Sequence, residues 1–126
     1  MTVHFPELAR LLEYDEARVQ RVVWEFYRSS IKDLHNLEQA TVAQHWQVAR
    51  QLARRIQVSC LQVGERDAAN AAADLISLPG DRFADAYRQS RVQIIYSLDR
   101  AEEFVGHKMA GRESSLGSQD ASESRH

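Results

Sequence analysis

Residues 41–64, TVAQHWQVARQLARRIQVSCLQVG, constrain the fold more than any other part of the chain. Their apolar residues recur every three or four positions, a spacing that gathers them on one side of an α-helix. These residues are Trp46, Ala49, Ala53, Ile56, Cys60 and Val63. Thr41 and Gln44 have the spacing of a capping box, and Gly64 can leave the helix at its end. The sequence therefore predicts a helix over 41–64 with one buried side.

The other side of this predicted helix is mostly polar, and we expect it to decide the function. It carries Gln47, Arg50, Gln51, Arg54, Gln57, Val58 and Leu61, with Arg55 next to Arg54. Arginine and apolar anchors dominate many protein interfaces, so exposed Val58 and Leu61 beside Arg54 would form a docking patch. The alternative is that the preceding helix or its aromatic side chains cover Val58 and Leu61.

Four further helices are predicted by the same apolar spacing. The first is short and begins near Pro6, with Phe5, Leu8, Leu11 and Leu12 on one side. Asp15 is a suitable N-cap for a long helix to about Gln39. Its buried stripe comprises Val19, Val23, Phe26, Ser30, Leu34 and Leu37, widened by Val22 and Ile31, with Trp24 and Tyr27 at its edge. We expect these two aromatic rings either to pack against a neighbouring helix or to stay partly open to solvent.

The remaining helices follow the segment 41–64. Residues 65–78 are rich in alanine, which favours a helix with little side-chain bulk. After the turn at Pro79, Asp81 opens a last helix that we expect to end at Gly106. Its buried stripe is Phe83, Tyr87, Ser90, Ile94, Leu98, Ala101 and Val105. No stretch alternates apolar and polar residues in the manner of a strand, so no sheet is predicted.

This pattern predicts an all-α protein of one domain, since 126 residues with 44% hydrophobic content suit a single core. The expected architecture is an antiparallel up-down four-helix bundle with a short extra N-terminal helix. Residues 1–105 form the bundle in this prediction. Residues 106–126 are rich in serine, glycine and charge, and we expect them to form a flexible tail.

The predicted helix over 41–64 resembles the central helix of bacterial histidine-phosphotransfer (HPt) domains, W-x6-A-H-x-[LI]-K-G-[SA]-[SA]-x3-G. The residues that match the pattern are Trp46, Ala53, Ile56, Ser59 and Gly64, and Cys60 stands in the same register at its second small-residue position. Arg54 stands where the family has its phospho-accepting histidine, Gln57 where it has lysine, and Val58 where it has glycine. The resemblance extends over the helix pattern from Glu7 to Val105 and implies the HPt fold.

Arg54 cannot replace the histidine chemically, because its guanidinium stays protonated and has no lone pair to attack phosphorus. None of the five histidines has the lysine and glycine context of the family; they are His4, His35, His45, His107 and His126. No spacing of His, Cys, Asp or Glu indicates a metal site, and no catalytic or phosphate-binding motif is present. We therefore expect no enzyme activity, cofactor or metal.

The resemblance implies a partner from two-component signalling, because HPt domains dock onto receiver domains and kinases. A receiver's phosphorylation pocket holds carboxylates around a metal ion, and a guanidinium can pair with them. We expect a non-phosphorylatable adaptor or inhibitor that binds a receiver domain or sensor kinase. Its partner-binding residues would be Arg54, Val58, Arg50, Gln51, Gln57, Leu61, Arg55 and Tyr27. The alternatives are a working phosphotransfer protein that uses another histidine, and a helical interaction module outside phosphorelays that uses Trp24 and Tyr27.

Composition restricts the partner and the compartment. The net charge of −2 argues against nucleic-acid binding, which normally needs a basic surplus. The single cysteine, Cys60, cannot form an internal disulfide and suits a reducing compartment. No apolar run approaches the roughly 20 residues of a membrane span, and the N-terminus lacks a signal-peptide pattern. We expect a cytoplasmic monomer or weak homodimer.

Overall fold

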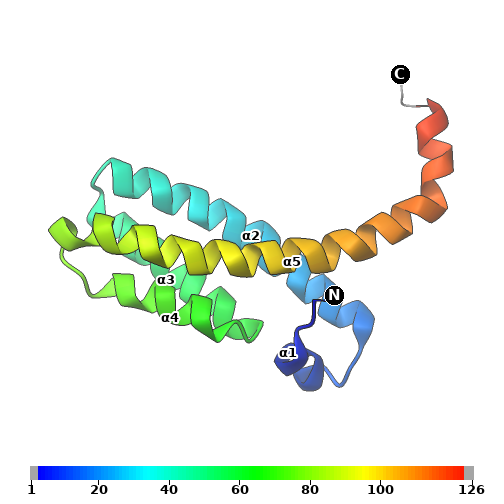
Figure 1. Cartoon of the computed structure of the whole chain (residues 1–126), viewed down its shortest axis with the longest axis horizontal. Helices are drawn as coiled ribbons and strands as arrows, with labels where there is room; N and C mark the ends of the chain where they lie inside the picture. The colour runs from blue at the N-terminus through cyan, green and yellow to red at the C-terminus, as the bar shows by residue number, and fades with distance from the viewer. Residues whose placement is uncertain (1–2, 124–126) are drawn as a thin grey trace.

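The computed structural model describes the backbone of residues 3–123 and the side chains as far as Gly106. Five helices make up most of it, and no strand occurs between residues 3 and 123 (Figure 1). They are α1 (Pro6–Leu11), α2 (Glu16–Val42), α3 (Trp46–Gln62), α4 (Arg66–Ile76) and α5 (Gly80–Glu123). The prediction of an all-helical chain is confirmed.

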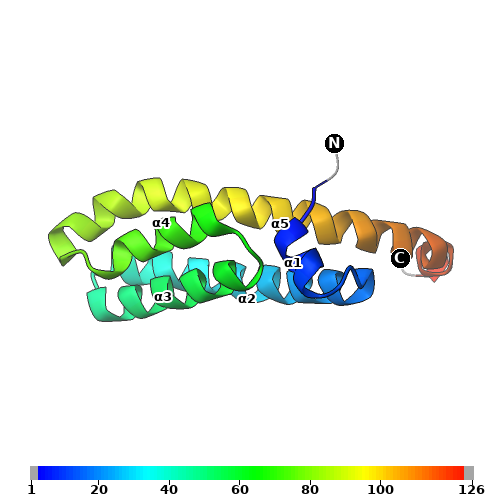
Figure 2. The same ribbon diagram turned by 90° about the horizontal axis from the view of Figure 1, so that it is seen from below.

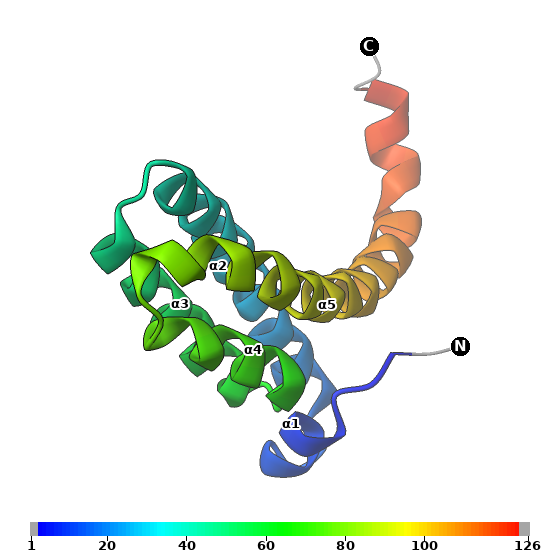
Figure 3. The ribbon, with the colours of Figure 1, turned by 60° about the vertical axis from the view of Figure 1, so that its left-hand side comes forward.

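The four longer helices pack around a shared core. α2 and α4 each pack against both α3 and α5, so α3 and α5 occupy opposite corners of the packed helices. In Figure 2, α5 runs along the upper side of the molecule and α3 along the lower side. The short α1 contacts α2 and lies beside its first turns (Figure 3).

Asp15 begins α2 as predicted, because its carboxylate accepts a hydrogen bond from the backbone N–H of Arg18 at 3.2 Å. The predicted buried stripe of α2 is buried throughout, and Val22 is partly buried beside it. Ile31 was expected to widen the stripe but is exposed. The helix also continues past Gln39 to Val42.

The predicted capping box at Thr41 and Gln44 is wrong. Thr41 lies in the last turn of α2, where its hydroxyl donates to the carbonyl of Leu37 at 2.8 Å. Gln44 has a φ of 60°, and this left-handed residue lies in the turn between α2 and α3. α3 begins only at Trp46, and His45 at its N-cap makes no side-chain capping bond. The predicted role of Gly64 at the C-terminal end of the helix is confirmed, because Gly64 has a left-handed φ of 77° just after α3 ends.

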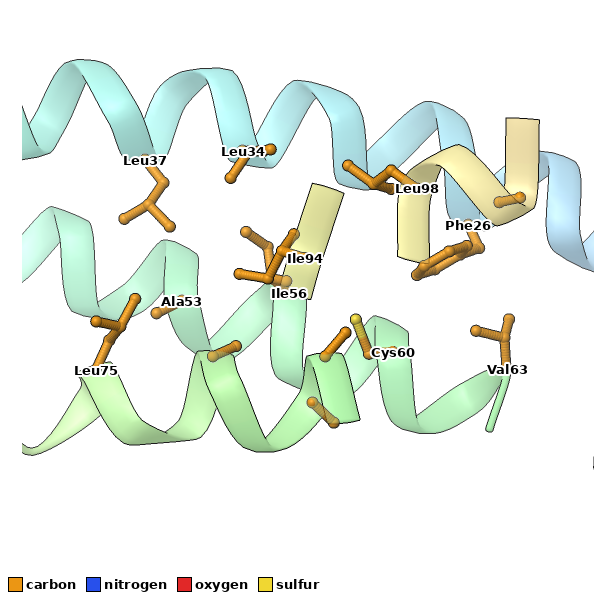
Figure 4. Packing of buried hydrophobic residues seen from close by; sticks show 14 of the residues in the cluster. Phe26, Leu34, Leu37, Ala53, Ile56, Cys60, Val63, Leu75, Ile94 and Leu98 are labelled. Carbon is orange, nitrogen blue, oxygen red and sulfur yellow. The ribbon is translucent and has the colours of Figure 1, made fainter. Parts of the chain in front are cut away.

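The core combines small residues on α3 and α4 with large ones from α2 and α5. In Figure 4, Leu34 and Leu37 extend from α2 toward Ile56 and Ala53 of α3. The alanines of α4 that we expected to permit close packing are buried, namely Ala68, Ala69, Ala71 and Ala72. Cys60 lies among them, and burial followed by the charge of Glu65 raises the pKa of its thiol to about 12.

The start of α5 is fixed by contact with the start of α3. The indole of Trp46 lies so close to Gly80 that a Cβ atom there would overlap the ring. The same indole packs on Phe83, with 5.5 Å between ring centroids. Gly80 is therefore required by the close approach of a side chain, not by an unusual backbone conformation.

α1 is attached at several points although it is short. Phe5 and Leu8 are buried, as predicted, whereas Leu11 was expected on the same side and is exposed. Arg100 of α5 donates to the carbonyl of His4 at 2.7 Å and lies over the ring of Phe5. Glu7 forms an ion pair with Arg66 at the start of α4, with 2.6 Å between Oε2 and Nη2.

α5 buries all seven residues of its predicted stripe, from Phe83 to Val105. The helix end that we predicted at Gly106 is not observed, because α5 continues to Glu123. The side chains after Gly106 and the whole of residues 124–126 lie outside the described part of the chain. The flexibility of residues 106–126 therefore stays a prediction.

Candidate functional site

The side of α3 that points away from the core is the candidate site. Burial of the apolar seam turns a set of exposed residues outward, which we call the outer face of α3: Gln47, Gln51, Arg54, Val58, Leu61 and Gln62. Between Trp46 and Gln62 there is no acidic residue. The outer face of α3 is therefore uncharged or positive along its whole length.

Arg54 lies in the middle of this face and is exposed, as expected. Within the part of the chain whose side chains are described, its guanidinium has no hydrogen-bond or ion-pair partner. A guanidinium carries five N–H donors and a permanent positive charge. Arg54 can therefore offer all its donors to an anionic group on a partner without first breaking an internal contact.

Val58 and Leu61 follow Arg54 on the same face and expose 48% and 49% of their surface. α2 does not cover them, so the alternative in which the preceding helix hides these side chains is wrong. Two half-exposed aliphatic groups, one and two turns after an unpaired arginine on the same face, form an amphipathic surface. Such surfaces provide the apolar anchors and the cation that are enriched at protein interfaces.

Arg55 differs from Arg54 because its positive charge is paired with a carboxylate. Its Nε lies 3.3 Å and 3.2 Å from the two carboxylate oxygens of Asp33, and Asp33 is buried in the α2–α3 contact. A shallow hollow on this seam is lined by Ser29, Asp33, Arg54, Arg55, Val58, Ser59 and Gln62. Arg55 therefore ties α3 to α2 at the edge of the candidate surface. Asp33 was not predicted from the sequence, where its only signal is a carboxylate beside the buried stripe.

Arg50 also has an internal partner. Its Nε and Nη2 donate to the carbonyl of Leu78 at 3.1 Å and 2.9 Å, just after the end of α4. Lysine and arginine side chains commonly satisfy the free carbonyls near helix ends. Arg50 and Gln57 are partly buried, whereas Gln51 is exposed on the outer face of α3.

Tyr27, the last predicted partner-binding residue, lies on another side of the molecule. Its ring stacks on Trp24 with 6.2 Å between centroids. Burial, then the charges of Glu102 and Asp99 on α5 and a hydrogen bond with Glu102, raise the pKa of the Tyr27 phenol. Tyr27 thus belongs to the seam between α2 and α5, and the structure does not bring it together with Arg54.

None of the three histidines whose side chains are described belongs to the outer face of α3. His4 precedes α1, His35 lies in α2 and His45 is the N-cap of α3, all exposed, and His107 and His126 lie beyond the described side chains. Among the described residues, no group of His, Cys, Asp and Glu is arranged to hold a metal ion. None of the helices in that part of the chain combines the length and the apolar character needed to cross a membrane.

Comparisons with protein-family models, with curated proteins and with solved structures find no match to this chain. The case for a function therefore depends on the chemistry of the outer face of α3.

Proposed function

We propose that the chain is a non-phosphorylatable HPt-like signalling protein without enzyme activity of its own. In this proposal α2–α5 form the antiparallel up-down four-helix bundle of the HPt type, and α3 is its docking helix. The protein binds the receiver domain of a response regulator, or a sensor kinase, and modulates a phosphorelay as an adaptor or inhibitor. One observation carries the proposal: Arg54 is exposed and unpaired among the described side chains, at the position where the resemblance puts a phospho-accepting histidine.

The chemistry of Arg54 separates binding from transfer. Phosphotransfer needs an imidazole nitrogen with a free lone pair, which a guanidinium does not have. The same guanidinium forms strong, charge-assisted hydrogen bonds with carboxylates, often two at once. A protein with arginine at this position holds an acidic pocket without receiving phosphate from it.

Val58 supports a binding role in the same way. In the family a glycine follows the histidine by one turn and lets the partner come close. Val58 fills that space with a branched side chain that is half exposed, and Leu61 extends the apolar surface. Both side chains lose water on docking, at roughly 25 cal/mol for each Å² of apolar surface buried.

Titration of the chain with receiver domains tests the role of Arg54. Arg54→Glu puts a carboxylate against the carboxylates of the receiver, so we expect affinity to fall at least tenfold, about 1.4 kcal/mol. Arg21→Glu on α2 is the matched control, because Arg21 is also exposed and the substitution makes the same change in net charge. Equal affinities for wild type and Arg54→Glu would remove Arg54 from the mechanism.

A phosphotransfer assay tests the second part of the proposal. The chain is incubated with phosphorylated receivers and examined for acid-labile phosphate, with a true phosphotransfer protein as the positive control. We expect no label. Phosphate on any histidine would establish the alternative of a working phosphotransfer protein.

The second candidate is a helical interaction module outside phosphorelays. It is favoured by the Trp24–Tyr27 stack, which remains partly exposed on the α2–α5 seam. Helical bundles serve many unrelated functions, so the architecture does not distinguish the two candidates. Affinity capture from the native cell extract discriminates between them, because it identifies the partner without presuming a pathway.

A further inference from the structure

The side of α5 that points away from the core has an exposed apolar surface of its own. Val92 and Tyr96 lie one turn apart and expose 64% and 63% of their surface. Asp99 and Glu103 continue the same ridge and are also exposed. We call these four residues the outer face of α5.

The four residues of this face carry two negative charges, on Asp99 and Glu103, whereas the outer face of α3 carries the positive charge of Arg54. The exposed Arg88 lies one turn before Val92, at the end of the ridge away from the two carboxylates. Among the described side chains, neither Asp99 nor Glu103 has an ion-pair partner. The neighbouring Arg100 does not neutralise them, because it pairs with Glu65 at 3.0 Å on the side toward α4. The charge of Asp99 reaches as far as α2, where it contributes, after burial and Glu102, to the raised pKa of Tyr27.

The outer faces of α3 and α5 therefore have similar apolar residues and charges of opposite sign. Each consists of two exposed apolar side chains within one helical turn, Val58 with Leu61 on α3 and Val92 with Tyr96 on α5. Arg54 flanks the first pair, and Asp99 flanks the second. Complementary charges guide association and fix its orientation, and the apolar pairs contribute the buried area.

We propose that the outer face of α5 in one molecule docks onto the outer face of α3 in a second copy of the same chain. Apart from the contact of Trp46 with Gly80 and Phe83 where they begin, α3 and α5 lie at opposite corners, each packed between α2 and α4 (Figure 2). The contact is therefore heterologous, and every pair formed leaves one face of each kind free. Such contacts add molecules beyond a dimer, into a ring where the rotation between copies closes and into an open chain where it does not.

Sedimentation velocity of the full chain tests this proposal over roughly two decades of concentration around 0.1 mM. The average sedimentation coefficient should keep rising past the value of a dimer. Salt should weaken the association, because the Debye length shortens from about 10 Å at 0.1 M to about 3 Å at 1 M.

A pair of valine substitutions tests whether association depends on the outer face of α5 or on exposed apolar surface in general. Val92→Ser should weaken association about tenfold, whereas Val42→Ser should leave it unchanged. Val42 exposes 79% of its surface, is the last residue of α2 and belongs to neither face. Asp99→Arg and Arg54→Glu should each weaken association, and Asp74→Arg on α4 is the charge control.

Mixing two variants provides the sharpest test of two different faces. Arg54→Glu keeps the acidic face of α5, and Asp99→Arg keeps the basic face of α3. Each variant alone should stay monomeric at concentrations where the wild type associates. An equimolar mixture should associate, because each supplies the face that the other lacks.

Three results would overturn the proposal. The wild type could remain monomeric throughout the concentration range. Val92→Ser and Asp99→Arg could associate as strongly as the wild type, which would indicate a symmetric contact through α3. The mixture could stay monomeric although both variants melt like the wild type. None of these results bears on receiver binding, which Val92→Ser should retain in full.

Discussion

Arg54 and Arg55 are adjacent in the sequence but have opposite surroundings. Arg55 pairs with the carboxylate of Asp33, whereas Arg54 has no partner among the described side chains. The side chain of Asp33 is only 6% exposed, so loss of Arg55 leaves a buried charge without its counter-ion. Arg55 thus stabilises the packing of α3 on α2, whereas Arg54 remains available to a partner.

Two alanine substitutions test this difference. Arg55→Ala should lower the free energy of unfolding by about 1–2 kcal/mol, less than a fully buried pair would cost because Arg55 is itself 66% exposed. Arg54→Ala should change it by no more than about 0.5 kcal/mol. Urea unfolding of both variants gives the two values. Equal losses would mean that Arg54 also stabilises the fold.

Two glycines of α5 allow a second comparison at the level of single residues. Gly80→Ala places a methyl group into the indole of Trp46, so we expect a loss of about 1–3 kcal/mol. Gly106→Ala meets nothing within 4 Å and should stabilise the helix by about 0.5–1 kcal/mol. Thermal and urea unfolding measure both. A stabilised Gly80→Ala would show that Trp46 moves aside without cost.

Among the helices, α1 depends most on a single side chain for its attachment to the rest of the molecule. Arg100 joins the carbonyl of His4, the ring of Phe5 and the carboxylate of Glu65. Arg100→Ala should release α1 locally, so that the amides of residues 8–12 exchange with deuterium at least tenfold faster. Arg66→Ala is the control, since its ion pair with Glu7 is largely exposed and contributes about 0–1 kcal/mol. Unchanged exchange in Arg100→Ala would assign the attachment of α1 to its apolar contacts alone.

The buried faces of the helices were predictable, and their ends were less so. Apolar spacing identified the buried stripes of α2, α3 and α5, because burial is periodic along a helix. The expected cap at Thr41 failed because a hydroxyl in a last turn can donate to the carbonyl four residues earlier, and Thr41 does so with Leu37. Gly106 did not end α5, since one glycine costs a helix only about 1 kcal/mol.

The candidate site was also predictable in part. The exposure of Arg54, Val58 and Leu61 followed from their place opposite the buried seam. The partners of Arg55 and Arg50 did not, because Asp33 and Leu78 are 22 and 28 residues away in sequence. Such contacts depend on how the helices pack, which helical spacing alone does not specify.

At the scale of the whole molecule, stability should fall in alkaline solution. Burial and the charge of Glu38 raise the pKa of Tyr87 to about 12, from an ordinary value of 10, and the pKa of Cys60 is raised to about 12 from 9. The unfolded chain loses the Cys60 proton above about pH 9 and the Tyr87 proton above about pH 10, while the folded chain keeps both to about pH 12. The free energy of unfolding therefore decreases with pH, by at most about 1.4 kcal/mol per pH unit for each group.

Urea unfolding at pH 8, 10 and 11 measures this dependence. Tyr87→Phe should reduce the loss between pH 10 and 11, because it removes one of the two groups. Tyr14→Phe is the control, since Tyr14 is an exposed tyrosine outside the core. A loss of equal size in the wild type and in Tyr87→Phe would assign the effect to other groups.

The contact of Trp46 with Gly80 has a mechanical consequence. It leaves no clearance between the first turn of α3 and the first turn of α5, although 33 residues of chain separate them. A partner that displaces the first turn of α3 sideways must displace the first turn of α5 with it. The outer faces of α3 and α5 are therefore mechanically coupled through the indole ring of Trp46.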